Sequence, residues 1–314
     1  MKLGCAGKIL GKPGLKSYDA RRRSNNPHLS VSLAYVRDIL CYLDGVDIRF
    51  YRLSARLAPY LSHPDMPEFH GQIEECESEL TFIGTLAQRM SLRLSIHAPL
   101  HVVLSATDED IARQSANELT ALARILDALK VGPEGIIIVH AGGVYNDKKA
   151  AMLRFAHRYE SLPETTRQRL ALENDHSRYS LSEVWELSRR CGCPVVFDRL
   201  HHLLNNPEGL PTDEALQMAL ESWPVGITPI IHFSSPRTDM HYVTHGRGAA
   251  AEHSVRRPLW SEHSDYVNPF EFIGFMKHVG TVRDFDVMIE AKGNDLAVIR
   301  LREDIRRLSP QIEL

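Results

Sequence analysis

The run Ile136-Ile137-Ile138-Val139-His140 decides the fold, because four consecutive β-branched residues end at a histidine. A short apolar run of this kind is typical of a strand that is buried on both faces of a parallel sheet. Comparable runs recur, with helical stretches between them, at residues 2–5, 48–53, 93–97, 169–173, 194–198, 229–233 and 286–291. Together they make eight, the number of strands that closes a (β/α)8 barrel. The sequence therefore predicts an α/β fold, a TIM barrel.

Length and composition fit one such barrel. The chain has 314 residues, of which 43% are hydrophobic and 25% charged, as in ordinary globular proteins. Stretches at 108–129 and 181–190 have helical spacing of apolar residues, and Ser180 is a suitable N-cap for the second. We expect a single domain over residues 1–314, with two long loops at 7–27 and 234–264. Both loops follow strands, so both should lie on the C-terminal face, where TIM-barrel active sites are found.

The composition also argues against several classes of protein. The N-terminus is too polar for a secretory signal, and no apolar run reaches the roughly 18 residues of a membrane span, so we expect a cytoplasmic protein with no membrane partner. The five cysteines lack zinc-finger spacing and are interpreted as ordinary thiols. Nothing in the sequence requires more than a monomer.

Basic residues gather in the two long loops, although the net charge is −3. The first loop contains Lys8, Lys12, Lys16 and residues 21–23, and the second region contains Arg237, Arg247, Arg256 and Arg257. These runs are consistent with contacts to phosphate groups. Equally, each run fits a loop whose charges face only water.

Six consecutive predicted strands end in residues that bind metals. They end at His97, His140, Glu173, Asp198, His232 and Glu290. A polar side chain at the end of an apolar strand lies in surroundings of low polarity, where it needs a hydrogen-bond or charged partner. Carboxylates and imidazoles that converge there obtain such a partner when they bind a common cation. Three histidines with three carboxylates suit Mn²⁺, Fe²⁺ or Zn²⁺, and Mg²⁺ is a further candidate. Because six ligands exceed the needs of one ion, we expect two or three ions, with Glu173 as a bridging carboxylate.

Further histidines follow the same strands. His63, His201 and His263 come after the second, sixth and seventh predicted strands, and His202 is the direct neighbour of His201. A single histidine in such a place is more often a surface or core residue than a ligand. The position after a strand favours a role in the site for the first three, whereas His202 is expected to pack elsewhere.

These residues also show a resemblance to a known family. The segments SIHAP, VHAGGVY, ALENDH, VVFDRLHH, IHFSS, HSDY and DVMIEAKG, together with IRFYRLSARLAPYLSHP, are similar to the motifs of UV damage endonucleases, in order from about residue 45 to residue 300. A set of ordered motifs is far more specific than one short pattern. The resemblance implies a TIM-barrel DNA repair endonuclease that uses divalent ions, typically manganese, to cut the phosphodiester bond 5′ of a damaged base.

The resemblance also implies roles for individual residues. It makes the six residues at the strand ends metal ligands, with His63 and His263 completing the coordination. It assigns catalytic roles to Glu173, Glu290, His201 and Lys292, and it implies double-stranded DNA with a lesion as the partner. The expected substrate contacts are Leu100, His101, Asn174, Tyr145 and Arg237.

The chain departs from the family's pattern at the residues that probe the lesion. Where the family has a Gln and an aromatic residue after the third strand, this chain has Leu100 and His101, and Cys5 and Ile9 stand where the family has Tyr and Asn. Ile230 or Ile231 stands at the position of the family's modified lysine. Leu100 is a candidate for an apolar side chain inserted between base steps, and His101 for a stacking residue.

Two alternatives to a repair endonuclease stay open from the sequence. A TIM barrel with a His/carboxylate site also suits an enzyme of small molecules, such as a sugar isomerase or epimerase or an iron-dependent oxygenase, and the altered probing residues favour this alternative. A relative without catalytic activity is the third hypothesis. A small-molecule enzyme should fold its long seventh loop over a closed pocket.

Overall fold

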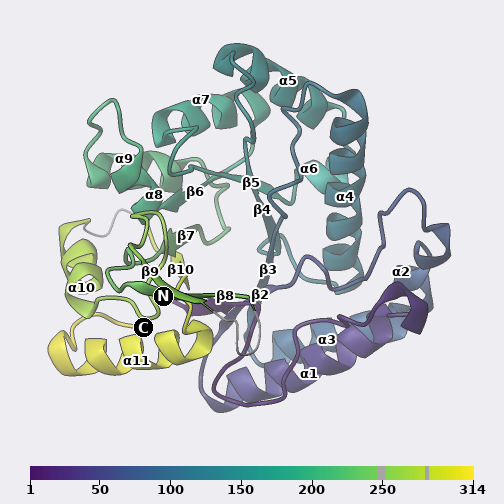
Figure 1. Cartoon of the computed structure of the whole chain (residues 1–314), viewed down its shortest axis with the longest axis horizontal. Helices are drawn as coiled ribbons and strands as arrows, with labels where there is room; N and C mark the ends of the chain where they lie inside the picture. The colour runs from purple at the N-terminus through teal and green to yellow at the C-terminus, as the bar shows by residue number, and fades with distance from the viewer. Residues whose placement is uncertain (247–251, 280–282) are drawn as a thin grey trace.

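The computed structural model describes residues 1–246, 252–279 and 283–314. Eight parallel strands form a closed barrel in the order β1-β10-β7-β6-β5-β4-β3-β2, with helices around it (Figure 1). The barrel strands are β1 (Leu3–Ala6), β2 (Phe50–Leu53), β3 (Arg93–His97), β4 (Ile136–His140), β5 (Leu170–Glu173), β6 (Val195–Asp198), β7 (Ile230–Phe233) and β10 (Asp286–Ile289). Each overlaps one predicted run, so the (β/α)8 TIM barrel is confirmed.

The helices lie between the strands and cover the outside of the barrel. They are α1 (Leu29–Gly45), α2 (Gln72–Glu75), α3 (Glu77–Arg89), α4 (Glu109–Ala128), α5 (Lys148–Glu160), α6 (Glu164–Arg167), α7 (Leu181–Cys191), α8 (Arg199–Leu204), α9 (Thr212–Glu221), α10 (Pro269–His278) and α11 (Asn294–Leu308), with short 3-10 turns at Arg23–Asn25 and Pro67–Phe69. The predicted helix after Ser180 is confirmed as α7, where Ser180 and Glu183 form a capping box. No helix among the described residues has both the length and the apolarity needed to cross a membrane.

Inward-facing side chains of the barrel strands form layers, because alternate residues of a strand point to the same side. Ile138, Ala171, Val196, Ile230, Met288 and Phe50 are buried together in one apolar cluster. Two residues further along each of these strands are His140, Glu173, Asp198, His232, Glu290 and Arg52. A polar layer therefore lies directly above an apolar layer. Gly4 leaves room for this packing, since a Cβ there would lie 2.7 Å from the Phe50 ring.

An ion pair closes the opposite end of the barrel. Arg93 begins β3 and Asp286 begins β10, and the Arg93 guanidinium lies 2.9 Å from the Asp286 carboxylate, with both side chains buried. The second carboxylate oxygen accepts a hydrogen bond of 2.8 Å from the Lys2 backbone N–H. Because β1 and β2 separate the two strands in the barrel order, this pair joins non-adjacent strands across the N-terminal end.

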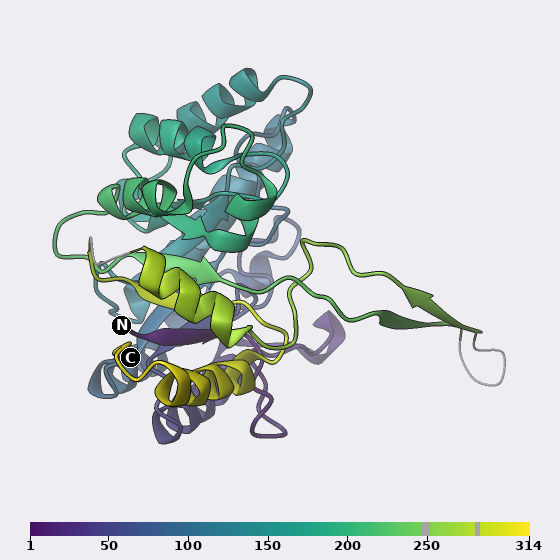
Figure 2. The same ribbon diagram turned by 90° about the vertical axis from the view of Figure 1, so that its left-hand side faces the viewer.

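The two long loops differ from each other in structure. In the loop at 7–27, the buried Asp19 accepts hydrogen bonds from the Arg21 side chain and from the His28 backbone N–H at the start of α1. The loop at 234–264 contains two antiparallel strands, β8 (His241–His245) and β9 (Glu252–Arg256), which the sequence pattern did not indicate. This hairpin projects well beyond the barrel (Figure 2). Arg247, one of the basic residues noted in the sequence, lies outside the described residues.

We predict that Arg93→Met lowers the free energy of unfolding by about 3–5 kcal/mol, because it leaves the buried Asp286 carboxylate without its partner. Urea unfolding followed by circular dichroism measures the change. The double variant Arg93→Met/Asp286→Leu removes both charges and should recover much of the loss. A single variant as stable as the unmodified protein would contradict the role of this pair.

Candidate metal centre

The polar layer of the barrel is centred on Glu173, the last residue of β5. Its carboxylate is 1% exposed, and it lies opposite His140 in the register of β4 and β5. One oxygen, Oε2, lies 2.9 Å from His97 Nε2 and 3.6 Å from His140 Nε2. The other, Oε1, lies 2.8 Å from His232 Nδ1 and 3.6 Å from His201 Nδ1. Four imidazoles from four elements thus surround one buried carboxylate.

The six residues predicted at strand ends fall into two groups of possible ligands that share Glu173. In each group, donor atoms from all members lie within 4.8 Å of one another: His97, His140 and Glu173 in one, and Glu173, Asp198, His232 and Glu290 in the other. The barrel order explains the second group, because β6, β7 and β10 are neighbours and Asp198 pairs with His232 in register. The arrangement is able to hold a divalent cation at either group.

Several buried atoms of these residues have no hydrogen-bond partner among the described residues. They are Asp198 Oδ2, His140 Nδ1 and His232 Nε2. The other Asp198 oxygen accepts a 2.7 Å hydrogen bond from the His201 backbone N–H and so caps α8. Burying a polar atom without a partner costs free energy, and a metal–ligand bond would remove this cost for an oxygen or an unprotonated ring nitrogen. The residues present therefore fit a bound metal.

The electrostatics of the site balance acids against imidazoles. Burial alone would raise the pKa of Glu173, but the charges of His232 and His140 and the hydrogen bonds from His232 and His97 together hold that pKa well below its usual value. Burial would likewise lower the pKa of His201, but Asp198, Glu173 and Glu290 outweigh it and raise that pKa to about 9. Glu173 and Glu290 likewise outweigh burial and raise the pKa of His232, whereas burial lowers the pKa of His140 and raises that of Asp198. A bound cation would replace the protons that His201 and His232 hold.

Arg52 is a member of the site that the sequence interpretation missed. It lies on β2, its side chain is 18% exposed, and its guanidinium forms an ion pair with Glu290. With His232 it outweighs the effect of burial and holds the pKa of Glu290 well below its usual value. The signal was available, because an arginine between the buried residues Tyr51 and Leu53 of a strand needs a charged partner.

The neighbouring histidines differ in how close they come to the two groups. His201 is buried on α8, and its Nδ1 lies 2.9 Å from the Asn174 carbonyl oxygen and 3.7 Å from Asp198 Oδ2. His263 Nδ1 lies 3.8 Å from Glu290 Oε2. The ring of His176, which the sequence interpretation did not single out, lies 5.5 Å from that of His201. His202 packs against Phe197, outside the site, as the sequence predicted.

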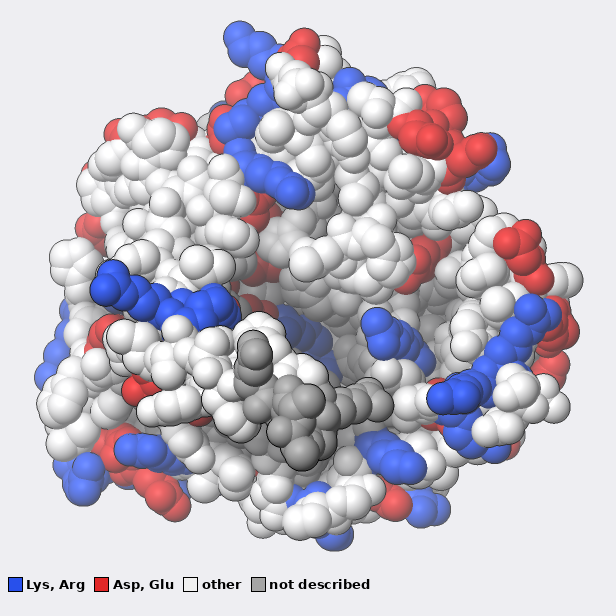
Figure 3. All heavy atoms as spheres, viewed as in Figure 1, with Lys and Arg blue, Asp and Glu red and all other residues white. Residues whose placement is uncertain are grey.

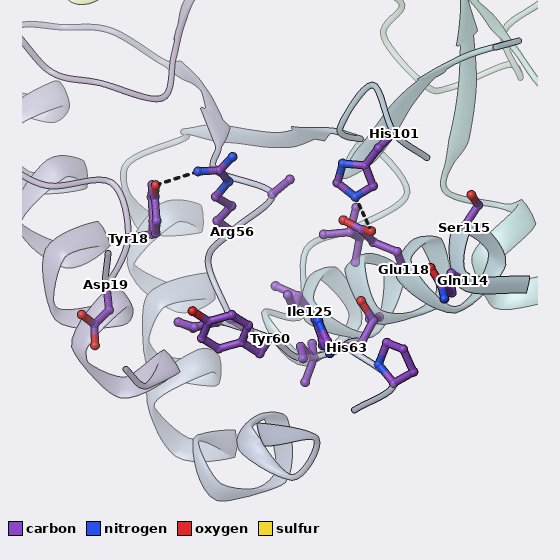
Figure 4. Close-up of a pocket in the computed structure, with 18 of the residues that line it drawn as sticks. Tyr18, Asp19, Arg56, Tyr60, His63, His101, Gln114, Ser115, Glu118 and Ile125 are labelled. Atoms are coloured by element: carbon purple, nitrogen blue, oxygen red, sulfur yellow. Dashed lines mark hydrogen bonds and ion pairs between the residues drawn. The ribbon is translucent and has the colours of Figure 1, made fainter. Parts of the chain in front are cut away.

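Two further predicted site residues line a separate cavity. The cavity has a volume of about 770 Å³ and lies beside the barrel, between the loops after β1 and β2 and helix α4 (Figure 4). His63 lines it, its Nδ1 accepts a hydrogen bond of 3.2 Å from the Asp65 backbone N–H, and it belongs to neither ligand group. His101 also lines it, 2.9 Å from Glu118. Their roles as ligand and substrate contact stay predictions.

The other predicted residues lie around the site in different environments. Leu100 is 81% exposed, and Lys292 is exposed, with its backbone N–H donating to the Ser264 carbonyl oxygen. Asn174 is buried, and its side-chain amide exchanges hydrogen bonds of 2.9 and 3.0 Å with the Asp198 backbone. Tyr145 is half-exposed at a φ of 48°, and Arg237 forms an ion pair of 3.1 Å with Asp265. The catalytic and substrate roles assigned to these five residues stay predictions.

The fold and the site define a TIM-barrel protein with a His/carboxylate cluster able to bind metal at the C-terminal ends of its strands. Residues 19–311 match the family described as UV-endonuclease UvdE. The chain is 31% identical over 261 residues to a UV DNA damage endonuclease of Bacillus pumilus, a match that covers 82% of this chain and 75% of that protein. The chain therefore belongs to the UvdE family.

Solved structures agree with this assignment. The crystal structure of SacUVDE superposes with a TM-score of 0.80 and 26% identity, covering 98% of this chain and 99% of that one. The D-psicose 3-epimerase of Clostridium cellulolyticum H10 gives a TM-score of 0.53 at 14% identity, covering 98% of this chain and 92% of that one. The second likeness shows a shared barrel fold alone.

We predict that Glu173→Gln raises the apparent Kd for Mn²⁺ by about 100-fold or more, because it replaces a charged oxygen shared by both ligand groups with an amide. Isothermal titration calorimetry on the metal-free protein measures this Kd, and circular dichroism checks that the barrel is folded. The matched control is Glu214→Gln on the surface of α9, which should bind Mn²⁺ as the unmodified protein does. Unchanged affinity in Glu173→Gln would exclude Glu173 as a ligand.

Proposed function

We propose that this protein is a metal-dependent DNA repair endonuclease that hydrolyses the phosphodiester bond 5′ of a damaged base in double-stranded DNA. The observation that supports this most is the pair of ligand groups joined at Glu173, found in a chain of the UvdE family. Two groups that share a carboxylate suit two or three divalent ions, with manganese as the first candidate and zinc, iron or magnesium as others.

The chain's own residues have distinct tasks in this proposal. One cation would be held by His97, His140 and Glu173, and another by Asp198, His232 and Glu290 with Glu173. When bound, the ions supply a water molecule of lowered pKa and offset the charge that develops on the phosphate. His201, whose Nδ1 lies 3.6 Å from Glu173 and 3.7 Å from Asp198, is proposed to contact a phosphate oxygen beside the two groups. At the edge of the site, His63 and His263 are proposed to complete the metal coordination. Lys292 is proposed to take part in catalysis, and Arg237 to contact the substrate.

The shape of the C-terminal face supports a large substrate over a small one. A small-molecule enzyme was expected to fold its seventh loop over a closed pocket, whereas the hairpin in this loop extends away from the barrel (Figure 2). Lys and Arg side chains lie at several points around the central hollow of this face (Figure 3). A hollow bordered by positive charge suits the phosphates of a duplex.

One observation keeps a sugar isomerase or epimerase as the second candidate. His101, which stands at the family's aromatic position, lies 2.9 Å from Glu118 of α4, so this contact has to break before the ring can stack on a base. A small-molecule enzyme of this kind would turn over sugars with Mn²⁺ and would leave DNA intact.

The proposal predicts cleavage of an end-labelled duplex with one pyrimidine dimer in the presence of Mn²⁺, with the cut directly 5′ of the lesion. Denaturing gel electrophoresis locates the cut, and an undamaged duplex of the same sequence is the control. Glu173→Gln should cut at least about 1,000-fold more slowly, because it lacks a ligand shared by the two ions. No cleavage by the unmodified protein, together with epimerisation of a sugar, would replace this proposal with the second candidate.

We further predict that Leu100→Ala reduces the preference for the damaged over the undamaged duplex by about 3- to 10-fold, since the exposed Leu100 side chain is proposed to enter the base stack at the lesion. The ratio of kcat/KM for the two duplexes measures this preference, and the Mn²⁺ content should not change. Leu153→Ala, an equally apolar exposed site on the outer helix α5, is the matched control. An unchanged ratio in Leu100→Ala would exclude this role.

A further inference from the structure

The β8–β9 hairpin is a two-stranded ribbon whose two faces differ. The strands pair in antiparallel register, with Tyr242 opposite Val255 and Thr244 opposite His253, so these four side chains share one face. The opposite face contains His241 opposite Arg256 and Val243 opposite Ser254. Each strand has five residues and so spans about 17 Å.

The first face and the base of the hairpin expose an unusual amount of apolar surface. Tyr242 is 86% exposed and Val255 is 59% exposed. Met240, Leu259 and Trp260, which flank the two strands, are also exposed. An isolated two-stranded hairpin is marginally stable in water, and exposed apolar patches usually mark a surface that a partner covers.

The second face and the chain around it show how the hairpin is fixed to the barrel. Glu262 lies 2.6 Å from the Arg256 guanidinium and 2.9 Å from His241 Nε2, so it joins both strands at their base. The next residue, His263, forms an isolated β-bridge with Pro236 and lies 3.8 Å from Glu290 of the metal centre. The hairpin therefore stands at a fixed place on the rim of the site.

The charges of the hairpin are mainly those of arginines. Residues 240–257 contain three arginines and one glutamate, with Arg247 outside the described residues, and the flanking Asp239 and Glu262 balance the two signs over residues 239–262. Glu262 takes up the charge of Arg256, and Arg257 is exposed without an ion pair among the described residues. An arginine without an ion pair beside exposed apolar side chains suits a partner that offers both anionic groups and apolar contacts, as a duplex does with its phosphates and thymine methyl groups.

We propose that the β8–β9 hairpin enters the major groove of the substrate duplex, with Tyr242 and Val255 against the edges of the bases and Arg257 on a phosphate. The major groove is about 12 Å wide and admits a two-stranded ribbon. Side chains such as these contact the methyl groups of thymine there, and arginines fix the ribbon on the backbone. This inference rests on the proposed function, and it gives the chain a DNA contact that does not depend on Leu100 or His101.

The test uses Tyr242→Thr/Val255→Thr, which removes the Tyr242 ring and one Val255 methyl group and keeps residues that favour strands. Fluorescence anisotropy measures Kd for a labelled duplex and for a short single strand of the same sequence, at fixed salt and with the full-length protein. We expect the Kd for the duplex to rise about 10-fold, because base-edge contacts are lost. The Kd for the single strand, the Mn²⁺ content and the kcat on the damaged duplex should stay unchanged. Phe82→Ala, an exposed aromatic residue on the outer helix α3, is the matched control and should change none of these.

A second variant tests the phosphate contact. Arg257→Gln should lower the slope of log K against log salt for duplex binding by about 0.9, the value expected for one lost phosphate contact. An unchanged duplex Kd in the double variant, or an equal loss for duplex and single strand, would overturn the inference. The inference would also be overturned if gel filtration showed a dimer for the unmodified protein and a monomer for the double variant. In that case a second copy of the chain would cover the hairpin. If the unmodified protein neither binds nor cuts DNA, both this inference and the proposed function are wrong. If the unmodified protein cuts DNA but the variants do not show the expected changes, only this inference is wrong.

Discussion

The buried carboxylate of Glu173 is the constraint on which the rest of the site depends. A carboxylate that is 1% exposed needs compensating positive charge, and the barrel supplies it as imidazoles from β3, β4, β7 and α8. The same demand explains why Glu290 is paired with Arg52, whereas Asp198 caps α8 with one oxygen and leaves the other without a hydrogen-bond partner among the described residues. The oxygens and ring nitrogens gathered in this way lie close enough together to hold a divalent cation.

The position of this centre follows from the alternation of side chains along the strands. Within the barrel, the layer of Ile138, Ala171, Val196 and Met288 separates the polar C-terminal end from the N-terminal end that Arg93 and Asp286 close. The apolar layer keeps water from reaching the residues of the polar layer through the N-terminal end of the barrel. Their charges therefore interact with one another and with molecules that bind at the C-terminal face. The ion pair between Arg93 and Asp286 and the candidate metal centre thus lie at opposite ends of the same eight strands.

The sequence predicted the strands and the six polar residues that meet at their ends because both depend on local patterns: an apolar run gives the strand, and the polar residue at its end gives a candidate ligand. Arg52 was missed because it lies within a strand. The sequence indicates that such an arginine needs a charged partner, but it does not show that this partner is Glu290, which follows β10, two strands away in the barrel order. The β8–β9 hairpin was missed because its strands are exposed on both sides and lack the alternation of apolar and polar residues that marks a half-buried strand. The contact of His101 with Glu118 joins residues 17 positions apart on a loop and a helix, which no periodic pattern encodes.

The attachment of the hairpin has a consequence for how such proteins diversify. The β8–β9 segment leaves the barrel after β7 and returns before α10, and Pro236 and His263 bring the two ends of the excursion together. Insertions, deletions or exchanges beyond this junction leave the register of the eight strands untouched. Changes to the hairpin can therefore alter the surface that borders the candidate metal centre, while the residues at the strand ends keep their places.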